Sequence, residues 1–125
     1  GCCNIGGNDV DLAALGPFSN IGSAYSGCSG RVSHCLSLRG PCFTVDTACS
    51  STVVAVDSGC QAIRTAKCKT AVCAGANVQI AASIWVGFSK MRGLAFDGRC
   101  KTFDSRADGF ARGEGLGACV LAPQA

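Results

Sequence analysis

Cys-Phe-Thr-Val-Asp-Thr-Ala-Cys-Ser-Ser, residues 42–51, is the stretch from which the fold can be built outward. Residues 42–46 are rich in aromatic and β-branched side chains and follow a Gly-Pro turn signal, which predicts a short β-strand. From Ser50 onward, apolar residues recur every three or four positions, which predicts a helix that ends near Ala66. The sequence therefore places Cys49 at a strand-to-helix turn.

The predicted helix carries an apolar stripe that we interpret as core packing. The stripe consists of Val53, Val56, Cys60 and Ile63. Asp46 or Thr47 is the expected cap of this helix, since both side chains can accept a hydrogen bond from its first turn. Residues 70–76 are small and apolar, which is typical of a strand buried on both faces. Strand, helix and strand together predict a βαβ unit with a right-handed crossover.

The remaining elements follow from shorter patterns of apolar and turn-forming residues. They are a helical turn at 10–15, a helix around 30–35, a helix at 80–92, an irregular loop at 93–115 and a final strand at 116–122. Alternating helices and strands predict the α/β class. With 125 residues, the chain has room for one domain with a core.

Composition excludes several classes of function. Hydrophobic residues make up 48% of the chain and charged residues 15%, a balance opposite to that of disordered chains. The net charge is +3, and the basic residues are scattered rather than interleaved with aromatic ones, so we expect no nucleic-acid partner. No apolar stretch is long enough to span a bilayer, and we expect no membrane association.

The eleven cysteines do not fit a disulfide scaffold or a metal site. Their number is odd and no signal peptide precedes them, and both features disfavour a secreted disulfide framework. There is no Cys-x-x-Cys, and His34 is the only histidine, so we expect no metal ligands. Most of these thiols are interpreted as small, reduced core residues in a reducing compartment.

Cys49 differs from the other cysteines by its position. At the start of a helix the first backbone N–H groups lack intrahelical partners and the macrodipole is positive. Both effects stabilise a thiolate. The same N–H groups can donate to the oxyanion that develops when sulfur attacks a thioester carbonyl. Position alone leaves two interpretations open, a nucleophile and a buried structural cysteine.

The segment Val45-Asp46-Thr47-Ala48-Cys49-Ser50-Ser51 resembles the active-site signature of the β-ketoacyl synthases, the condensing enzymes of polyketide and fatty-acid synthesis. Further blocks resemble that family in the same order and spacing, over roughly residues 16–122. They are Gly30-Arg31-Val32-Ser33, Leu38-Arg39-Gly40-Pro41, Asp97 to Asp104 and Ala107 to Gly115. Three positions depart from the pattern: His34 stands where the family has Tyr, and the stretches 51–53 and 94–96 vary.

The resemblance implies a partial thiolase-like fold, covering most of its N-terminal βαβαβ half. Residues 1–125 would be a partial ketosynthase domain of the type I modular polyketide synthases, truncated at both ends. Cys49 would be the catalytic residue and accept an acyl chain from the phosphopantetheine thioester of an acyl carrier protein, for decarboxylative condensation. No bound cofactor or metal is implied. The intact enzyme is expected to be a homodimer in the cytoplasm or a plastid.

The family also uses two downstream histidines and a lysine, which we expect to lie beyond Ala125, so the fragment alone should be inactive. Asp104, Arg106, Asp108, Arg112 and Glu114 are interpreted as an ion-paired loop framework near the site. Two other functions remain open. One is a fatty-acid synthase-type or other thiolase-superfamily condensing enzyme. The other is a non-catalytic, cysteine-rich structural or metal-binding module.

Overall fold

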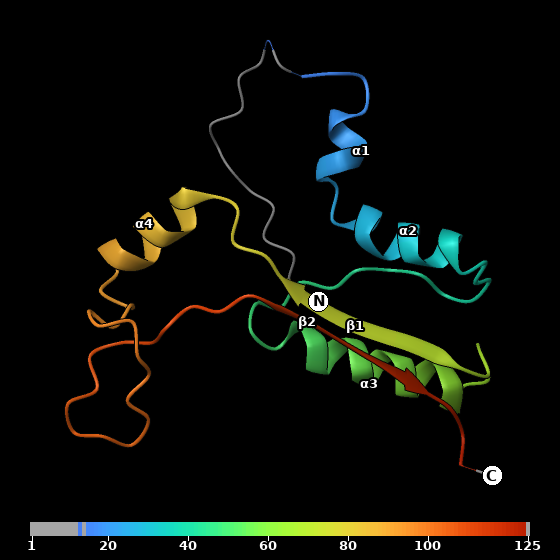
Figure 1. Ribbon diagram of the computed structural model, residues 1–125. Helices are drawn as coiled ribbons and strands as arrows, with labels where there is room; N and C mark the ends of the chain where they lie inside the picture. The colour runs from blue at the N-terminus through green and yellow to red at the C-terminus, as the bar shows by residue number, and fades with distance from the viewer. Residues whose placement is uncertain (1–12, 14, 125) are drawn as a thin grey trace.

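The computed structural model describes residues 13 and 15–124, which contain four helices and two strands (Figure 1). In chain order the elements are α1 (Ser19–Ser23), α2 (Ser26–Cys35), α3 (Ser51–Arg64), β1 (Ala71–Asn77), α4 (Ala82–Lys90) and β2 (Gly115–Leu121). The helix predicted from Ser50 and the strands predicted at 70–76 and 116–122 are confirmed within one or two residues. The mixed helix and strand content confirms the α/β class.

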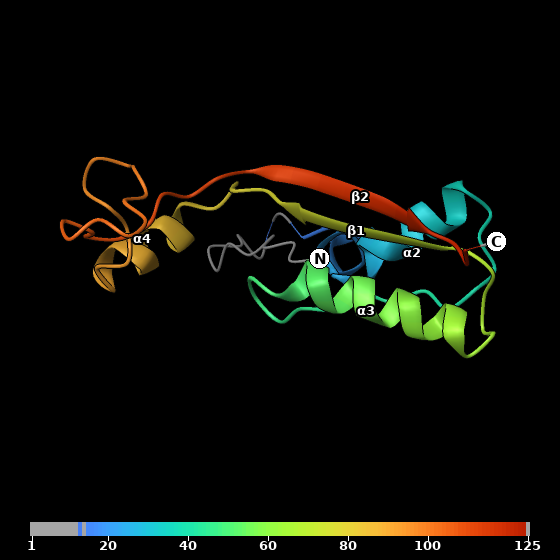
Figure 2. The ribbon, with the colours of Figure 1, turned by 90° about the horizontal axis from the view of Figure 1, so that it is seen from below.

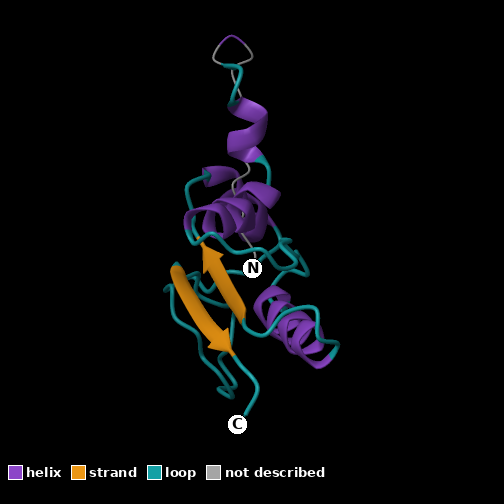
Figure 3. Ribbon diagram, turned by 90° about the vertical axis from the view of Figure 1, so that its right-hand side faces the viewer, coloured by secondary structure: helices purple, strands orange, loops and turns teal. Residues whose placement is uncertain are grey.

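The two strands form an antiparallel pair, orange in Figure 3. Their register runs from Ala71 opposite Leu121 to Asn77 opposite Gly115. The chain between them forms α4 and a long loop, which lie together beyond one end of the sheet (Figure 2). The sheet therefore connects two parts of the molecule, one built around α3 and one built around α4.

Helix α3 lies along one face of the sheet and approaches it closely through small residues (Figure 2). A Cβ atom at Gly59 would lie 2.6 Å from Cys73 Sγ, and one at Gly75 would lie 2.0 Å from Thr52 Oγ1. Both distances are far inside van der Waals contact, so only glycine fits at these two positions while the helix keeps its place. The Cys73 thiol also donates to the Ala55 carbonyl of α3, at 3.4 Å.

The apolar stripe predicted as core packing is wrong at Val53, while Val56, Cys60 and Ile63 are half-buried. The sheet contacts a different face of α3. The sheet-facing positions are Ser51, Ala55 and Gly59, of which Ser51 and Gly59 are buried. Val53, which belongs to the predicted stripe, is 72% exposed. Side-chain size explains the difference, because a helix rests closest to a sheet on its smallest side chains.

The strand predicted at residues 42–46 does not form, and with it the βαβ unit is reduced to its helix and second strand. A strand exists only where a neighbour supplies hydrogen bonds, and among residues 13 and 15–124 no strand is paired with this segment. It is held instead by side chains. Thr44 Oγ1 donates to the Tyr25 carbonyl at 2.9 Å and is hydrogen-bonded to Ser29 Oγ at 2.8 Å, which ties the segment to α2.

The remaining sequence-based predictions have mixed outcomes. The predicted helix at 30–35 is longer and begins at Ser26, while α1 was not predicted. Burial of β1 on both faces is wrong for the described residues, since Val72 on the face away from α3 is 40% exposed. The helix at 80–92 and the loop at 93–115 are confirmed as α4 and the segment that follows it. The helical turn predicted at 10–15 lies outside the described residues apart from Ala13 and Leu15.

We predict that Gly75→Ala destabilises the protein by about 1–3 kcal/mol, because the added methyl group overlaps the Thr52 side chain. Gly117 is the matched control: it is the register partner of Gly75, and no atom lies within 4 Å of a Cβ built there. Gly117→Ala should leave the midpoint of urea-induced unfolding unchanged or slightly higher. Thr52→Ala should recover part of the loss caused by Gly75→Ala, and strict additivity of the two changes would contradict the contact.

Candidate active site

Cys49 lies on a tight turn whose preceding residue, Ala48, has a left-handed backbone with φ of 56°. For a residue other than glycine this conformation costs about 1–2 kcal/mol and needs support from its surroundings. The Asp46 carboxylate accepts a hydrogen bond from Ala48 N–H at 3.0 Å. The Ala48 carbonyl accepts one from Ser51 N–H at 3.1 Å. The strained residue is thus held from both sides, and it sets the direction in which Cys49 leaves the turn.

The Ser51 side chain closes this turn. It is 1% exposed. Its hydroxyl accepts a hydrogen bond from Thr47 N–H at 2.8 Å and donates one to the Ala48 carbonyl at 2.7 Å. This one buried hydroxyl therefore links Thr47 to Ala48, the strained residue that follows it. Because α3 begins at Ser51, the turn is also fixed to the helix that rests on the sheet.

The N-cap of α3 is Ser50, and no side chain caps the helix by a hydrogen bond, so the predicted cap at Asp46 or Thr47 is wrong. The Asp46 carboxylate is already used by Ala48 N–H, and the Ser50 hydroxyl donates to the Thr47 carbonyl at 2.8 Å. Polar side chains here stabilise the turn rather than the first turn of the helix. The positive end of the α3 dipole therefore remains open beside Cys49.

Cys49 itself is exposed, unlike a buried structural cysteine. The Thr52–Gly75 contact places the start of α3 against the carboxyl-terminal half of β1. In the part of the chain that the structure describes, the Cys49 N–H group donates to no backbone carbonyl. An accessible thiol, its own free N–H group and a helix amino terminus therefore occur together at this turn.

Two cavities in the described residues are lined without Cys49. The first, of about 400 Å³, lies between α2, the segment 38–45, α3 and β1. The second, of about 690 Å³, is lined by residues of α4 and of the loop after it. We therefore do not assign either cavity as the binding site of an acyl group attached to Cys49.

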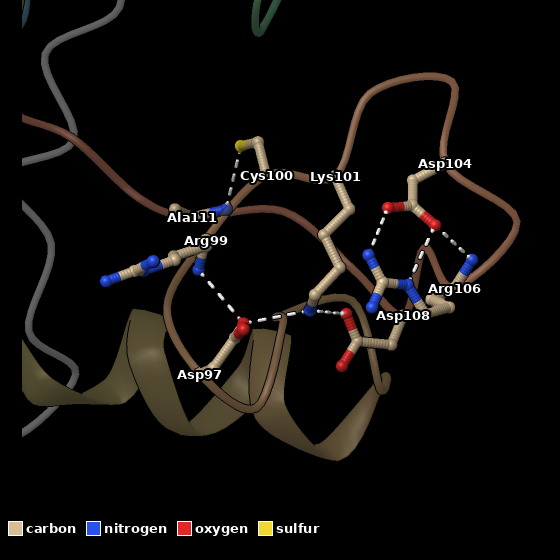
Figure 4. A network of polar contacts seen from close by, with 8 residues as sticks. All are labelled: Asp97, Arg99, Cys100, Lys101, Asp104, Arg106, Asp108 and Ala111. Atoms are coloured by element: carbon tan, nitrogen blue, oxygen red, sulfur yellow. Dashed lines mark hydrogen bonds and ion pairs between the residues drawn. The ribbon is translucent and has the colours of Figure 1, made fainter.

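The loop after α4 holds a network of ion pairs (Figure 4). Lys101 Nζ donates to the carboxylates of Asp97 at 2.9 Å and Asp108 at 2.5 Å. Arg106 donates to both oxygens of Asp104, at 3.1 Å and 2.8 Å. The predicted ion-paired framework is confirmed for Asp104, Arg106 and Asp108. The hydrogen bond to Lys101 holds the pKa of the Asp97 and Asp108 carboxyls below its usual range.

The predicted ion pairing is wrong for Arg112 and Glu114, which form no ion pair in the described residues. The Arg112 guanidinium lies over the Phe88 ring, 4.8 Å from its centroid, and donates to Gln79 Oε1 at 2.8 Å. The Glu114 carboxylate accepts a hydrogen bond from Gln79 N–H. These contacts attach the end of the loop to α4 and to the end of β1, so the charged residues fix the loop and do not converge on Cys49.

No group of three or more histidine, cysteine, aspartate or glutamate residues in the described ranges could hold a metal ion. The same residues contain no helix of sufficient length and apolar character to cross a membrane.

The family model of the β-ketoacyl synthase N-terminal domain matches residues 8–125, nearly the whole chain. The chain belongs to the β-ketoacyl synthase family. It is 45% identical over 112 residues to a phenolphthiocerol/phthiocerol polyketide synthase of Mycobacterium tuberculosis, a match that covers 90% of this chain and 6% of that protein. It is also 45% identical over 106 residues to an erythronolide synthase of Saccharopolyspora erythraea, covering 85% of the chain and 3% of the relative.

Solved ketosynthase domains have the same arrangement of elements. One from oxazolomycin biosynthesis in a Streptomyces albus strain superimposes with a TM-score of 0.79 at 36% identity and covers 82% of this chain. The ketosynthase of module 6 of the bacillaene synthase of Bacillus subtilis gives 0.78 at 33% identity. In each case this chain spans 18% of the solved chain. The likeness confirms the partial thiolase-like fold of this ketosynthase segment.

Sequence reasoning identified Cys49 and the helix behind it but missed the residues that shape the turn. Ala48 and Ser51 carry no obvious signal, since both are common small residues. Asp46 did carry one, because an aspartate two residues before a turn position often accepts the N–H of that residue. The position of Asp46 therefore indicates a turn at Ala48 rather than a cap of helix α3.

We predict that Ser51→Ala lowers the free energy of unfolding by about 1–3 kcal/mol, because the part-buried hydrogen bonds to Thr47 and Ala48 are lost together. Ser50→Ala is the control, since the neighbouring hydroxyl is exposed and its removal should change stability by no more than about 0.5 kcal/mol. Urea-induced unfolding of both variants provides the comparison. Equal effects would contradict the assignment of Ser51 as the residue that holds the turn.

A second prediction concerns acid stability. A carboxyl group whose pKa is lowered in the folded protein stabilises it above the unfolded pKa of about 3.9, and this contribution is lost as pH falls through the folded pKa. Lys101→Met removes the partner that lowers the pKa of Asp97 and Asp108. We expect the difference in unfolding midpoint between wild type and Lys101→Met to be present at pH 6 and to shrink below about pH 4. Lys90→Met, at an exposed position of α4, should give no such pH-dependent difference.

Proposed function

We propose that this chain is the acyl-accepting part of a condensing enzyme of polyketide biosynthesis, with Cys49 as its nucleophile. The observation that carries the proposal is the turn at Cys49, where an exposed thiol stands at the amino terminus of α3 behind a strained and doubly anchored residue. Membership of the β-ketoacyl synthase family supplies the class of reaction. The relatives with 45% identity are polyketide synthases, which supports polyketide rather than fatty-acid synthesis.

In the proposed step the Cys49 sulfur, as thiolate, attacks the carbonyl carbon of an acyl thioester on the phosphopantetheine arm of a carrier protein. The new carbon–sulfur bond forms through a tetrahedral intermediate, and the thiolate of the phosphopantetheine arm leaves with the electron pair of the broken bond. The Cys49 N–H group and the α3 amino terminus stabilise the oxyanion of that intermediate. The turn contributes by fixing the position of the Cys49 sulfur relative to the Cys49 N–H group.

Carbon–carbon bond formation then requires a second acyl unit, which loses CO₂ and attacks the acyl group on Cys49. No histidine of this chain fits a role in that step, because its one histidine, His34, is exposed on α2. We propose that residues outside these 125 supply it, as the family pattern implies. A carrier protein as partner, a homodimer, and a location in the cytoplasm or a plastid stay predictions.

We predict that Cys49→Ala abolishes acyl transfer from an acyl carrier protein to the intact enzyme, since this variant lacks the sulfur that we propose as the acyl acceptor. Cys35→Ala is the matched control, because Cys35 is also an exposed thiol but lies at the end of α2. Intact-protein mass spectrometry after incubation with the acyl carrier protein measures the acyl adduct. Retention of the adduct in Cys49→Ala, or its loss in Cys35→Ala, would contradict the proposal.

The same experiment separates the other functions. Transfer from a carrier protein without release of CO₂ from a malonyl donor would favour another thiolase-superfamily condensing enzyme. Absence of any adduct on a folded protein would favour a non-catalytic module.

A further inference from the structure

The pairing of β1 with β2 places two thiols directly opposite each other. Cys73 and Cys119 are register partners in the antiparallel pair. Opposed residues lie on the same face of a sheet, with Cα atoms about 4.5–5.5 Å apart. Disulfides form at Cα separations of about 4.4–6.8 Å. The Cα separation of the two cysteines is therefore in the range that a disulfide can span.

The two thiols differ in access. Cys73 is 6% exposed beneath α3, and its Sγ donates to the Ala55 carbonyl. Cys119 is exposed. Burial raises the pKa of the Cys73 thiol, and the Cys119 thiol beside it raises that pKa further. An external reagent reaches Cys119 first, while Cys73 is placed to react with whatever forms on Cys119.

We propose that Cys73 and Cys119 form a reversible cross-strand disulfide when the protein meets a small disulfide oxidant such as oxidised glutathione. Cys119, as thiolate, attacks one sulfur of the oxidant, forms a mixed disulfide and releases one thiolate. Cys73 loses its proton to solvent and attacks the Cys119 sulfur, which releases the second thiolate. Two protein thiols are oxidised to one disulfide, and one small disulfide is reduced to two thiols.

The bond would close the chain between residues 73 and 119, which contains α4 and the ion-paired loop. It would fix both ends of that segment at the sheet and restrict the unfolded chain, which stabilises the folded state. It would also remove the thiol hydrogen bond from Cys73 to Ala55 under α3. Cys49 takes no part in this chemistry, so the proposal does not depend on the acyl-transfer function.

Tryptic peptides make the test direct. The peptide 70–90 contains Cys73 as its single cysteine, and in this sequence the peptide that begins at Gly113 contains only Cys119. The intact protein is treated with oxidised glutathione, its remaining thiols are alkylated, and a digest is analysed by mass spectrometry without reduction. We expect the two peptides to appear linked, and the link to disappear after treatment with dithiothreitol.

Three variants sharpen the result. Cys119→Ser should abolish the link, and Cys100→Ser, which removes another exposed thiol, should leave it unchanged. Cys73→Ser keeps a hydrogen-bond donor for Ala55 and should trap glutathione on Cys119. Stable glutathione on Cys119 in the wild type, an unmodified Cys119, or a link from Cys73 to the peptide 40–64 that contains Cys60 would each overturn the proposal.

Discussion

The close approach of α3 to β1 is the constraint on which the rest of the described structure depends. Gly59 and Gly75 remove the side chains that would stand between helix and strand, and Cys73 and Thr52 fill the remaining space. This contact fixes the start of α3 against the carboxyl-terminal half of β1. The Cys49 turn, which leads directly into α3, takes its position from that contact, and so does any chemistry performed there.

The turn itself combines strain with anchoring. Ala48 adopts a left-handed conformation that its side chain disfavours, and hydrogen bonds from Ser51 and to Asp46 hold it there. Strained residues of this kind persist where surrounding interactions over-determine them. The buried Ser51 hydroxyl joins the strained residue to the helix, so the sulfur of Cys49 is presented by a rigid element rather than by a free loop.

The loop between α4 and β2 contributes stability of another kind. Asp97, Asp104 and Asp108 pair with Lys101 or Arg106, and the end of the loop contacts Gln79, two residues after β1. Charged residues in a loop of a catalytic domain invite an acid–base interpretation. Here the carboxylates of Asp97, Asp104 and Asp108 are paired with cations within the loop, and the predicted ion-paired framework is confirmed for three of its five residues.

The sequence by itself determined the helix at Cys49, both strands of the sheet, α4 and the family, because these depend on local periodicity and on ordered motifs that are visible along the chain. Tertiary structure alone decided three things: which face of α3 packs, whether residues 42–46 become a strand, and which residue holds the turn. Each depends on a neighbour distant in sequence. The sheet packs on the small side chains of α3 and leaves Val53 exposed, since close packing follows side-chain volume across the contact rather than apolar periodicity. Residues 42–46 have strand propensity, but a ladder needs a partner strand, and the described chain offers none.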